Sequence, residues 1–213
     1  MVMLDLACRT AGGGRHGLRA VRALLCGLAL ACAGAPATLS AEKVQVDICF
    51  NYGCHHQAVA RFAGVDREEL RGMLSAAADA AGERAALAHV VGRMYAIAAT
   101  QTPIWRDRGR NGMDERHLEG AMDCIDHSTN TEAFLRLLQS AGLLRFHQPG
   151  PRTPRFAFLV FGEHWTATLV ETATASRYAV DGWFFDPGMP VAVVALERWR
   201  AGYDPENEVG ASR

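Results

Sequence analysis

Alternating apolar and polar positions open the part of the chain that carries the fold. Val44, Val46 and Ile48 alternate with polar neighbours, and this period of two predicts a short strand. From about residue 66 to residue 100 the apolar positions recur at the spacing of a helix instead. Gly82 interrupts this pattern, so the segment is expected to form two helices.

A further helix is predicted for the stretch that ends at Gln139, and Cys124 stands just before it. The apolar stripe of this helix is formed by Phe134, Leu135, Leu137 and Leu138. Three residues of the type that caps helices stand near its start: Ser128, Thr129 and Thr131. Gly142 follows the helix as a stop signal.

Strands are expected to dominate the last third of the chain. The predicted strands cover residues 156–161, 164–170, 177–185 and 191–194. The first is apolar throughout and is expected to be buried, while the prolines and glycine of residues 149–154 are expected to break the chain before it. Residues 196–200 are expected to form a closing helical turn.

The order of these elements predicts the fold class. Helices come first and a run of strands follows, which is typical of an α+β fold with an antiparallel sheet. We therefore expect N-terminal helices and a Cys-bearing helix to pack on one antiparallel sheet. Residues 42–213 are long enough for a single domain with a real core.

The N-terminal residues 1–41 have the pattern of a signal peptide. Arg15, Arg19 and Arg22 form a positive region, residues 23–35 form an apolar run, and small residues follow. Cleavage is expected after Ala37 or Ala41. The mature protein is therefore expected to be exported to the periplasm or the extracellular space.

Two alternatives to this interpretation stay open. An uncleaved membrane anchor is one, although Gly34 and Pro36 interrupt the apolar run. A lipoprotein is the other, because Cys26 and Cys32 stand within the same run. In the first case the protein would contact a membrane only through this segment.

Composition excludes several classes of function. Of 213 residues, 49% are hydrophobic, and the formal net charge is −1, which is typical of a globular protein and not of one that binds polyanions. Basic and aromatic residues do not interleave in a cluster, so nucleic-acid binding is not expected. We expect neither a cofactor nor a metal at the site.

Cysteine spacing predicts one disulfide in the mature chain. Cys49, Cys54 and Cys124 remain after cleavage, and the first two are five positions apart. An exported protein meets an oxidising compartment, so we expect Cys49 and Cys54 to be bridged and Cys124 to be free. Two other interpretations are a metal site that adds His55 and His56, and a nucleophilic Cys54 beside a histidine.

Cys124 has the context of a nucleophile. A thiol at a helix N-terminus faces the positive end of the helix dipole, which favours the thiolate, the form that attacks carbonyl carbon. The alternative is a small buried core residue, which is the usual role of a lone cysteine.

A predicted hairpin supplies the partners of this thiol. If the strands turn at residues 171–176, Val170 faces Arg177. His164 and Asp181 then project from the same face as diagonal neighbours, within reach of each other. A register slip of one residue would place them on opposite faces. With Cys124 they form a predicted Cys-His-Asp triad.

At these residues the chain resembles the transglutaminase-like branch of the papain-like superfamily. It is most similar to the bacterial transglutaminase-like cysteine proteinases, many of which are exported. The resemblance rests on Cys124 with Asp126 two positions later, on the pair His164-Trp165 and on Asp181, and it covers about residues 118–190. It implies a helix packed on an antiparallel sheet, a core of about residues 101–195, and acyl transfer from an amide.

The resulting hypothesis is an exported cysteine-dependent hydrolase or acyl transferase that acts on a peptide or side-chain amide. Cys124 attacks, His164 carries the proton and Asp181 orients the imidazole, while the oxyanion donor is the backbone N–H of Cys124 or a side chain such as Gln101 or Asn111. The expected partner is a peptide or protein substrate. The rivals are a binding or scaffold domain with an idle triad and an exported metal-binding protein.

Overall fold

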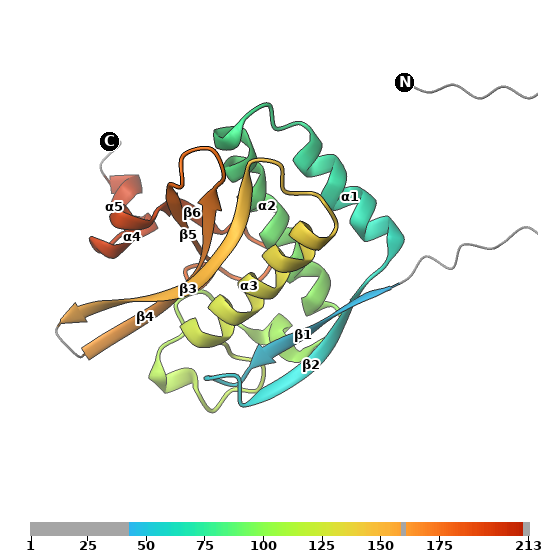
Figure 1. Ribbon diagram of the computed structural model, residues 1–213. Helices are drawn as coiled ribbons and strands as arrows, with labels where there is room; N and C mark the ends of the chain where they lie inside the picture. Colours follow the sequence, from blue (N-terminus) through green and yellow to red (C-terminus); the bar gives the residue numbers. More distant parts are fainter. Residues whose placement is uncertain (1–42, 159–160, 211–213) are drawn as a thin grey trace, which may run out of the picture. The chain divides into compact units, whose positions relative to one another are not determined.

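Two antiparallel sheets and five α-helices make up the computed structural model, which describes residues 43–158 and 161–210 (Figure 1). The α+β class is thereby confirmed, while the predicted signal peptide, residues 1–41, lies outside the described residues. The strands are β1 Val44–Phe50, β2 His56–Phe62, β3 His147–Phe158, β4 Phe161–Glu171, β5 Arg177–Asp181 and β6 Ala192–Ala195. The helices are α1 Gly64–Ser75, α2 Ala80–Ala99, α3 Cys124–Ser140, α4 Leu196–Arg200 and α5 Pro205–Gly210, with short 3₁₀ turns η1 Pro103–Arg106 and η2 Met113–Glu115.

The first sheet is the hairpin of β1 and β2. The strand predicted from alternation is confirmed, since Val46 and Ile48 are buried while Gln45 and Asp47 are exposed. Its partner β2 was not predicted, and the pairing runs antiparallel from Val44 opposite Phe62.

The two helices predicted between residues 66 and 100 are confirmed as α1 and α2, but they do not separate at Gly82. The break comes earlier, at residues 76–79. Asp79 is the N-cap of α2, and its carboxylate accepts a hydrogen bond from the Gly82 N–H at 2.7 Å. Gly82 thus lies in the first turn of α2, where the aspartate cap outweighs the low helix propensity of glycine.

The second sheet has the strand order β3-β4-β5-β6, and all its pairs are antiparallel. The expected break at residues 149–154 is wrong, because β3 continues through Pro149, Pro151 and Pro154 with only a register shift between Gly150 and Thr153. β3 is an edge strand, so a proline that lacks an N–H need not remove a ladder hydrogen bond.

The apolar run that follows does not form the single strand that was expected. It divides between the ends of β3 and β4, and the side chain of Phe156 is 55% exposed. These ends form the hairpin that extends beyond the rest of the sheet (Figure 1). Apolar composition alone therefore predicted extended chain here, but neither the division between two strands nor the exposure of Phe156.

The β4–β5 hairpin has the predicted register. Val170 pairs with Arg177, and the pairing continues to Ala167 opposite Val180. The loop is closed by the Glu171 N–H, which donates to the carbonyl of Ser176 at 2.8 Å.

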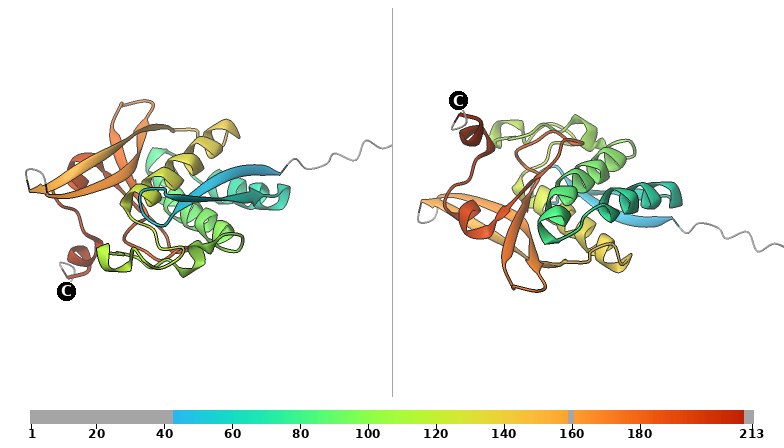
Figure 2. Two further views of the ribbon diagram at one scale, coloured as in Figure 1. Left: turned by 90° about the horizontal axis from the view of Figure 1, so that it is seen from below. Right: turned by 90° about the horizontal axis from the view of Figure 1, so that it is seen from above.

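α3 packs between the β1–β2 hairpin on one side and the four-stranded sheet on the other (Figure 2). Its apolar stripe supplies Phe134, Leu135 and Leu138, all of which are buried. The Phe134 ring meets Phe62 and Tyr95 edge-on, with centroids 5.9 Å and 5.0 Å away. Burying such a side chain stabilises the fold by about 1.5–3 kcal/mol, which fixes the helix and hence its first residue against the sheet.

The segment between α4 and α5 packs back onto the segment before η2. The predicted closing turn is confirmed as α4, and Arg110 forms a two-pronged ion pair with Asp204 just before α5. Within residues 43–158 and 161–210, no helix combines the length and the apolar character that crossing a bilayer requires.

Candidate active site

Cys124 is the first residue of α3, and two aspartates fix this start. The Asp123 carboxylate accepts from the Asp126 N–H at 2.9 Å, and the Asp126 carboxylate accepts from the Asp123 N–H at 3.2 Å. This reciprocal pair is a capping box with aspartate in both positions. The expected cap residues Ser128 and Thr129 instead lie inside the helix, so the helix begins at the cysteine itself.

The sulfur of Cys124 lies against the backbone of β4. Its thiol donates a weak hydrogen bond to the carbonyl of Glu163 at 3.9 Å, and the backbone N–H of Trp165 also bonds to the sulfur. These two residues flank His164. The helix start and the strand therefore bring the thiol against the backbone on both sides of the histidine predicted to serve it.

His164 is bonded to Asp181, as the register of the hairpin predicted. The imidazole Nε2 and the carboxylate Oδ2 are 2.7 Å apart, and the Asp181 side chain is almost fully buried. This contact assigns Nε2 to the carboxylate. The other ring nitrogen, Nδ1, is the one that can exchange a proton with a thiol.

Asp181 is held by two further donors. The indole N–H of Trp199 donates to the same Oδ2 at 2.7 Å, and the backbone N–H of Trp183 donates to Oδ1 at 3.1 Å. Both oxygens are thus fixed, which in turn fixes the rotation of the His164 ring. Trp199 comes from α4, and sequence reasoning did not connect it with the site.

Aromatic rings surround the imidazole. Trp183, Phe184 and Trp199 have ring centroids 4.8 Å, 5.7 Å and 5.6 Å from that of His164. They leave only 12% of the His164 side chain exposed. Because low polarity strengthens electrostatic contacts, the histidine–carboxylate bond is stronger here than in water.

Cys124 and His164 both line one cavity of about 480 Å³. Its apolar wall is formed by Tyr52, Met113, Ile125, Trp165 and Trp183. Its charged lining residues are Asp123, Arg155 and Glu163. The cavity is of a size that holds a side chain and a scissile amide next to the thiol.

The resting thiol is protonated, contrary to the expectation from the helix dipole. Burial is the largest of the effects that together raise the pKa of Cys124 to about 11: the negative charges of Asp123 and Asp181 act in the same direction, and the Trp165 N–H acts against them. Burial therefore outweighs the dipole. A nucleophilic sulfur in this site requires that His164 remove the proton.

The three predicted oxyanion donors are not equally well placed for that role. The amide of Gln101 bonds to both backbone groups of Arg61, at 2.9 Å and 3.0 Å, and Gln101 does not line the cavity. Asn111 lines the cavity, but its amide N–H₂ donates to Asp107 at 2.7 Å. The backbone N–H of Cys124 belongs to the first turn of α3 and has no acceptor within the helix, so it is the donor best placed for an oxyanion.

The predicted Cys49–Cys54 disulfide is present, and Cys124 is a free cysteine. In the described part of the chain, the two bridged sulfurs and the carboxylate of Asp126 lie within 4.8 Å of one another. Bridged sulfurs are not thiolates and do not ligate zinc in the manner that the metal interpretation needs. His55 and His56 are exposed and are not part of this group.

A second histidine–aspartate pair lies behind the helix start and was not predicted. The Nε2 of His127 is 3.1 Å from Oδ2 of Asp107, and both side chains are almost completely buried. Oδ1 of Asp107 accepts from the backbone N–H of Met122 at 2.7 Å, which ties the approach to α3 in place. No sequence signal separates this histidine from a core position on the buried face of the helix.

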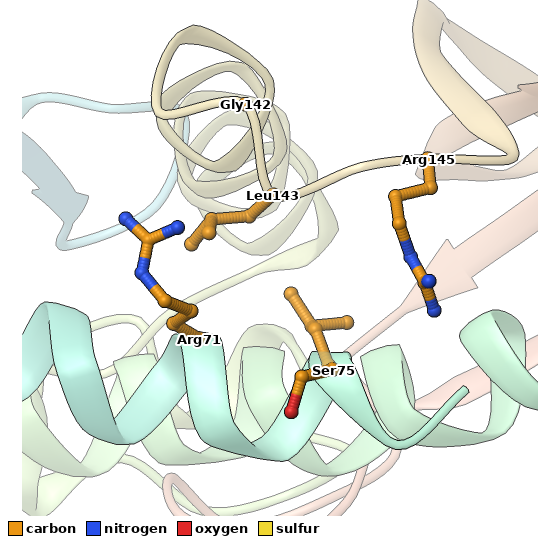
Figure 3. Close-up of a pocket in the computed structure, with 6 residues that line it drawn as sticks. Arg71, Ser75, Gly142, Leu143 and Arg145 are labelled. Atoms are coloured by element: carbon orange, nitrogen blue, oxygen red, sulfur yellow. The ribbon is translucent and has the colours of Figure 1, made fainter.

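A different cavity, of about 270 Å³, lies between α1 and the segment that follows α3 (Figure 3). It is lined by Arg71, Leu74, Ser75, Gly142, Leu143 and Arg145. This lining contains neither a thiol nor an imidazole, so it does not match the predicted chemistry.

Comparison with known proteins found no similar protein. No family model, no curated protein and no solved structure matches the chain.

Proposed function

We propose that this protein is a cysteine-dependent hydrolase or acyl transferase that acts on a peptide or side-chain amide through a thioester. The observation that carries the proposal is the meeting of Cys124 and a carboxylate-bound His164 at one cavity. The resemblance to transglutaminase-like cysteine proteinases, drawn from the order of Cys124, His164 and Asp181, supports the same reaction class.

The reaction begins with proton transfer. Nδ1 of His164 takes the proton of the Cys124 thiol, and the sulfur attacks the amide carbon, so that a carbon–sulfur bond forms. The oxyanion that develops is stabilised by the backbone N–H of Cys124. His164 then returns its proton to the departing amine as the carbon–nitrogen bond breaks, and water or a second amine resolves the thioester.

Asp181 acts through His164 and not on the substrate. It accepts a hydrogen bond from Nε2–H, which keeps Nδ1 unprotonated and aimed away from the carboxylate. It also stabilises the imidazolium that forms when the thiol is deprotonated. Since the pKa of Cys124 is about 11, this stabilisation is a large part of what the site must supply.

The cavity lining favours an apolar group beside the scissile amide. Trp165, Trp183 and Ile125 offer aromatic and aliphatic surface, and they lie next to the nucleophile. The disulfide and the N-terminal pattern support action outside the cytoplasm, in the periplasm or the extracellular space.

A binding or scaffold domain with an idle triad is the second candidate. One observation favours it, namely the raised pKa of Cys124, because a buried thiol that keeps its proton is a poor nucleophile. The two candidates differ in whether His164 activates the sulfur.

The test is the pH dependence of Cys124 alkylation by iodoacetamide in the non-reduced chain of residues 42–213, where Cys124 is the free cysteine. Wild type is expected to react near neutral pH, and His164→Ala to react about 10²–10⁴ times more slowly there, since the thiol then keeps its proton. His127→Gln is the matched control, because it alters the buried pair behind the helix. Equal rates in wild type and His164→Ala would favour the idle triad.

A further inference from the structure

The loop between β1 and β2 has an unusual backbone. Asn51, Tyr52, Gly53 and Cys54 have φ angles of 64°, 61°, 62° and 59°, so four successive residues are left-handed. Only Gly53 adopts this region without steric cost, and Asn51 tolerates it better than most residues. Such a run persists only where its surroundings hold it, and the Cys49–Cys54 disulfide closes it at both ends.

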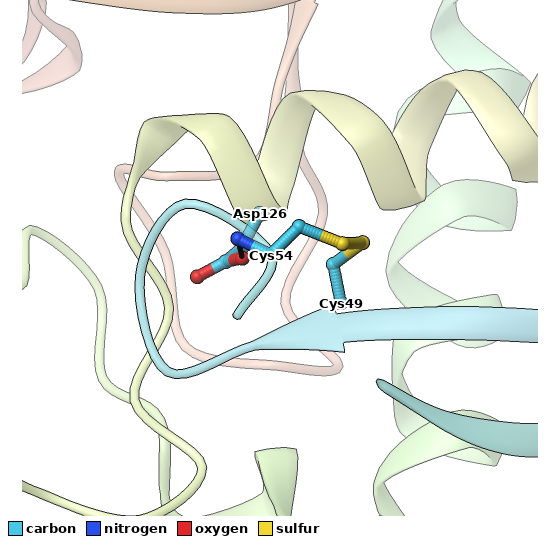
Figure 4. Close-up of side chains that lie close together, drawn as sticks. All are labelled: Cys49, Cys54 and Asp126. Atoms are coloured by element: carbon cyan, nitrogen blue, oxygen red, sulfur yellow. Dashed lines mark hydrogen bonds between the residues drawn. A yellow bond between two sulfur atoms is a disulfide. The ribbon is translucent and has the colours of Figure 1, made fainter. Parts of the chain in front are cut away.

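This loop binds the carboxylates that start the catalytic helix. The Gly53 N–H donates to Oδ2 of Asp123 at 3.0 Å, and the Cys54 N–H donates to Oδ1 of Asp126 at 2.6 Å. Figure 4 shows Asp126 bonded to Cys54 beside the disulfide. The same two carboxylates form the capping box around Cys124, so the left-handed run holds that box from outside.

Asn51 binds the segment that leads into the helix. Its N–H donates to the carbonyl of Ala121 at 2.8 Å, and its side-chain oxygen accepts from the Gly120 N–H at 2.8 Å. Gly120 has a φ of 87° and no room for a side chain against Pro103, so its place is tightly defined. The loop thus fixes the chain on the N-terminal side of Cys124.

Cys49 binds the second turn of α3. Its N–H donates to Oδ1 of Asn130 at 2.7 Å, and the Asn130 amide donates back to the Cys49 carbonyl at 2.9 Å. The side chain of Tyr52 forms part of the cavity wall, and its hydroxyl donates to the Gly112 carbonyl. The disulfide-closed loop therefore touches the helix before, at and after the nucleophile.

We propose that the Cys49–Cys54 loop positions Cys124 against His164, so that the site works only while this disulfide is closed. The inference rests on the proposed function and names its regulation. A dithiol opens the bridge: it delivers two electrons and two protons, the sulfur–sulfur bond breaks to give two thiols, and the dithiol becomes a disulfide. The left-handed run then relaxes, and the two carboxylates lose the donors that hold the helix start.

The site therefore has opposite redox requirements within one structure. Cys124 must be a free thiol, while Cys49 and Cys54 must be oxidised. Mild monothiols that repair an oxidised Cys124 are expected to raise amide turnover, and dithiols strong enough to open the loop are expected to lower it again.

The experiment measures how strongly Cys124 alkylation depends on His164, with and without the bridge, at pH 7 in the mature chain. With the bridge, His164→Ala is expected to slow iodoacetamide by at least about 100-fold. In the Cys49→Ser/Cys54→Ser background the same substitution is expected to slow it by less than about fivefold. Full retention of the His164 dependence without the bridge would overturn the proposal.

Controls separate positioning from general stability. Glu83→Gln disturbs a buried carboxylate far from the loop, which bonds to His147 at 2.8 Å, and it should keep the His164 dependence. If the double serine variant does not fold, Asn51→Ala takes its place with the bridge intact. It should reduce the His164 dependence several-fold, and an unchanged value would contradict the positioning role.

Failure of the proposed function is recognised separately. In that case wild type with its bridge closed shows no dependence on His164 at all. Hydrogen exchange of the backbone amides of residues 120–130 reports on the loop alone, because the proposal expects their protection to fall when the bridge is opened. If these amides were equally protected from exchange with and without the bridge, the positioning role would be wrong, whatever the chemistry of Cys124.

Discussion

Two histidine–aspartate pairs lie near the start of α3, and their hydrogen-bond distances are similar. His164 and Asp181 are 2.7 Å apart, and His127 and Asp107 are 3.1 Å apart. Both carboxylates are buried and both accept additional hydrogen bonds. The first pair reaches a cavity that also contains Cys124, whereas the second has no opening.

The free nitrogen of each imidazole shows what this difference means. Nδ1 of His127 is fully buried and has no hydrogen-bond partner among the described residues. A carbon added at Gly182 would lie 3.4 Å from it, so even a small group has little room there. A histidine–carboxylate pair is therefore chemically useful only where its second nitrogen meets a reactant, and otherwise it is part of the scaffold.

The largest contrast is expected from removing one charge in each pair. Asp181→Asn should lower amide turnover about 10²–10⁴-fold, because a neutral amide cannot stabilise the imidazolium of His164, and its single oxygen cannot serve both the donors to Oδ2 and the Trp183 N–H at Oδ1. Asp107→Asn should instead lower the free energy of unfolding by about 3 kcal/mol, as expected when a buried pair loses one charge. Turnover and urea unfolding of both variants measure the two effects.

The opposite outcome would contradict the roles assigned to the two pairs. If Asp107→Asn lost more turnover than Asp181→Asn, measured well below the unfolding transition of the variant, the assignment of His164 as the catalytic base would be wrong. Asp107 also holds the Met122 N–H, so a loss of a few-fold from movement of the helix start is compatible with the assignment.

A smaller effect is expected from the indole of Trp199. Trp199→Phe keeps an aromatic ring beside His164 but removes the donor to Asp181. Loss of one hydrogen bond to a charged group is expected to lower turnover about tenfold. KM should change little, because Trp199 does not line the cavity. Steady-state kinetics across pH measure this effect, and the exposed Trp105→Phe provides a matched loss of an indole. A change confined to KM would contradict the positioning role.

The smallest effect concerns stability and pH. Burial alone lowers the pKa of His127, but the hydrogen bond and charge of Asp107, with the charges of Asp181 and Asp126, raise it above its ordinary value. The folded state then binds a proton more tightly than the unfolded chain. This stabilisation is complete below about pH 6.5 and is lost as the pH rises through the folded pKa.

Thermal unfolding from pH 6 to pH 9 measures this contribution. The Tm of wild type should fall more steeply over this range than that of His127→Gln, by about 2–4 °C for each kcal/mol of proton-linked stability. The pKa of Asp126 is raised by burial and by Asp123 to about 7. Its contribution to stability therefore falls as the pH rises towards 7, and both proteins share this decline. Parallel curves above pH 7 would show that His127 does not titrate in this range.

The parts of the fold that the sequence predicted depend on local patterns. Alternation and turn residues determine a hairpin, so the pairing of Val170 with Arg177 and the approach of His164 to Asp181 followed from spacing alone. The Cys49–Cys54 bridge followed from proximity along the chain and from the expected compartment.

The remaining features depend on contacts between distant segments. Trp199 is 18 positions from Asp181, and Asp107 is 20 positions from His127, and neither separation has a recognisable pattern. The pKa of Cys124 could not be judged from its helix, because burial by β4 decides it. Whether a proline breaks a strand likewise depends on the neighbouring strands. β3 continues through its prolines because it lies at the edge of the sheet.

The order in which the site is built along the chain has a consequence for synthesis. Cys124 leaves the ribosome before His164 and Asp181 exist, and the indole that secures the carboxylate arrives only at position 199. The partner of Asn130, Cys49, is 81 residues away, so closing that contact is slow compared with forming the helix. During synthesis Cys124 therefore remains without its predicted partners until residues 164, 181 and 199 have all been made.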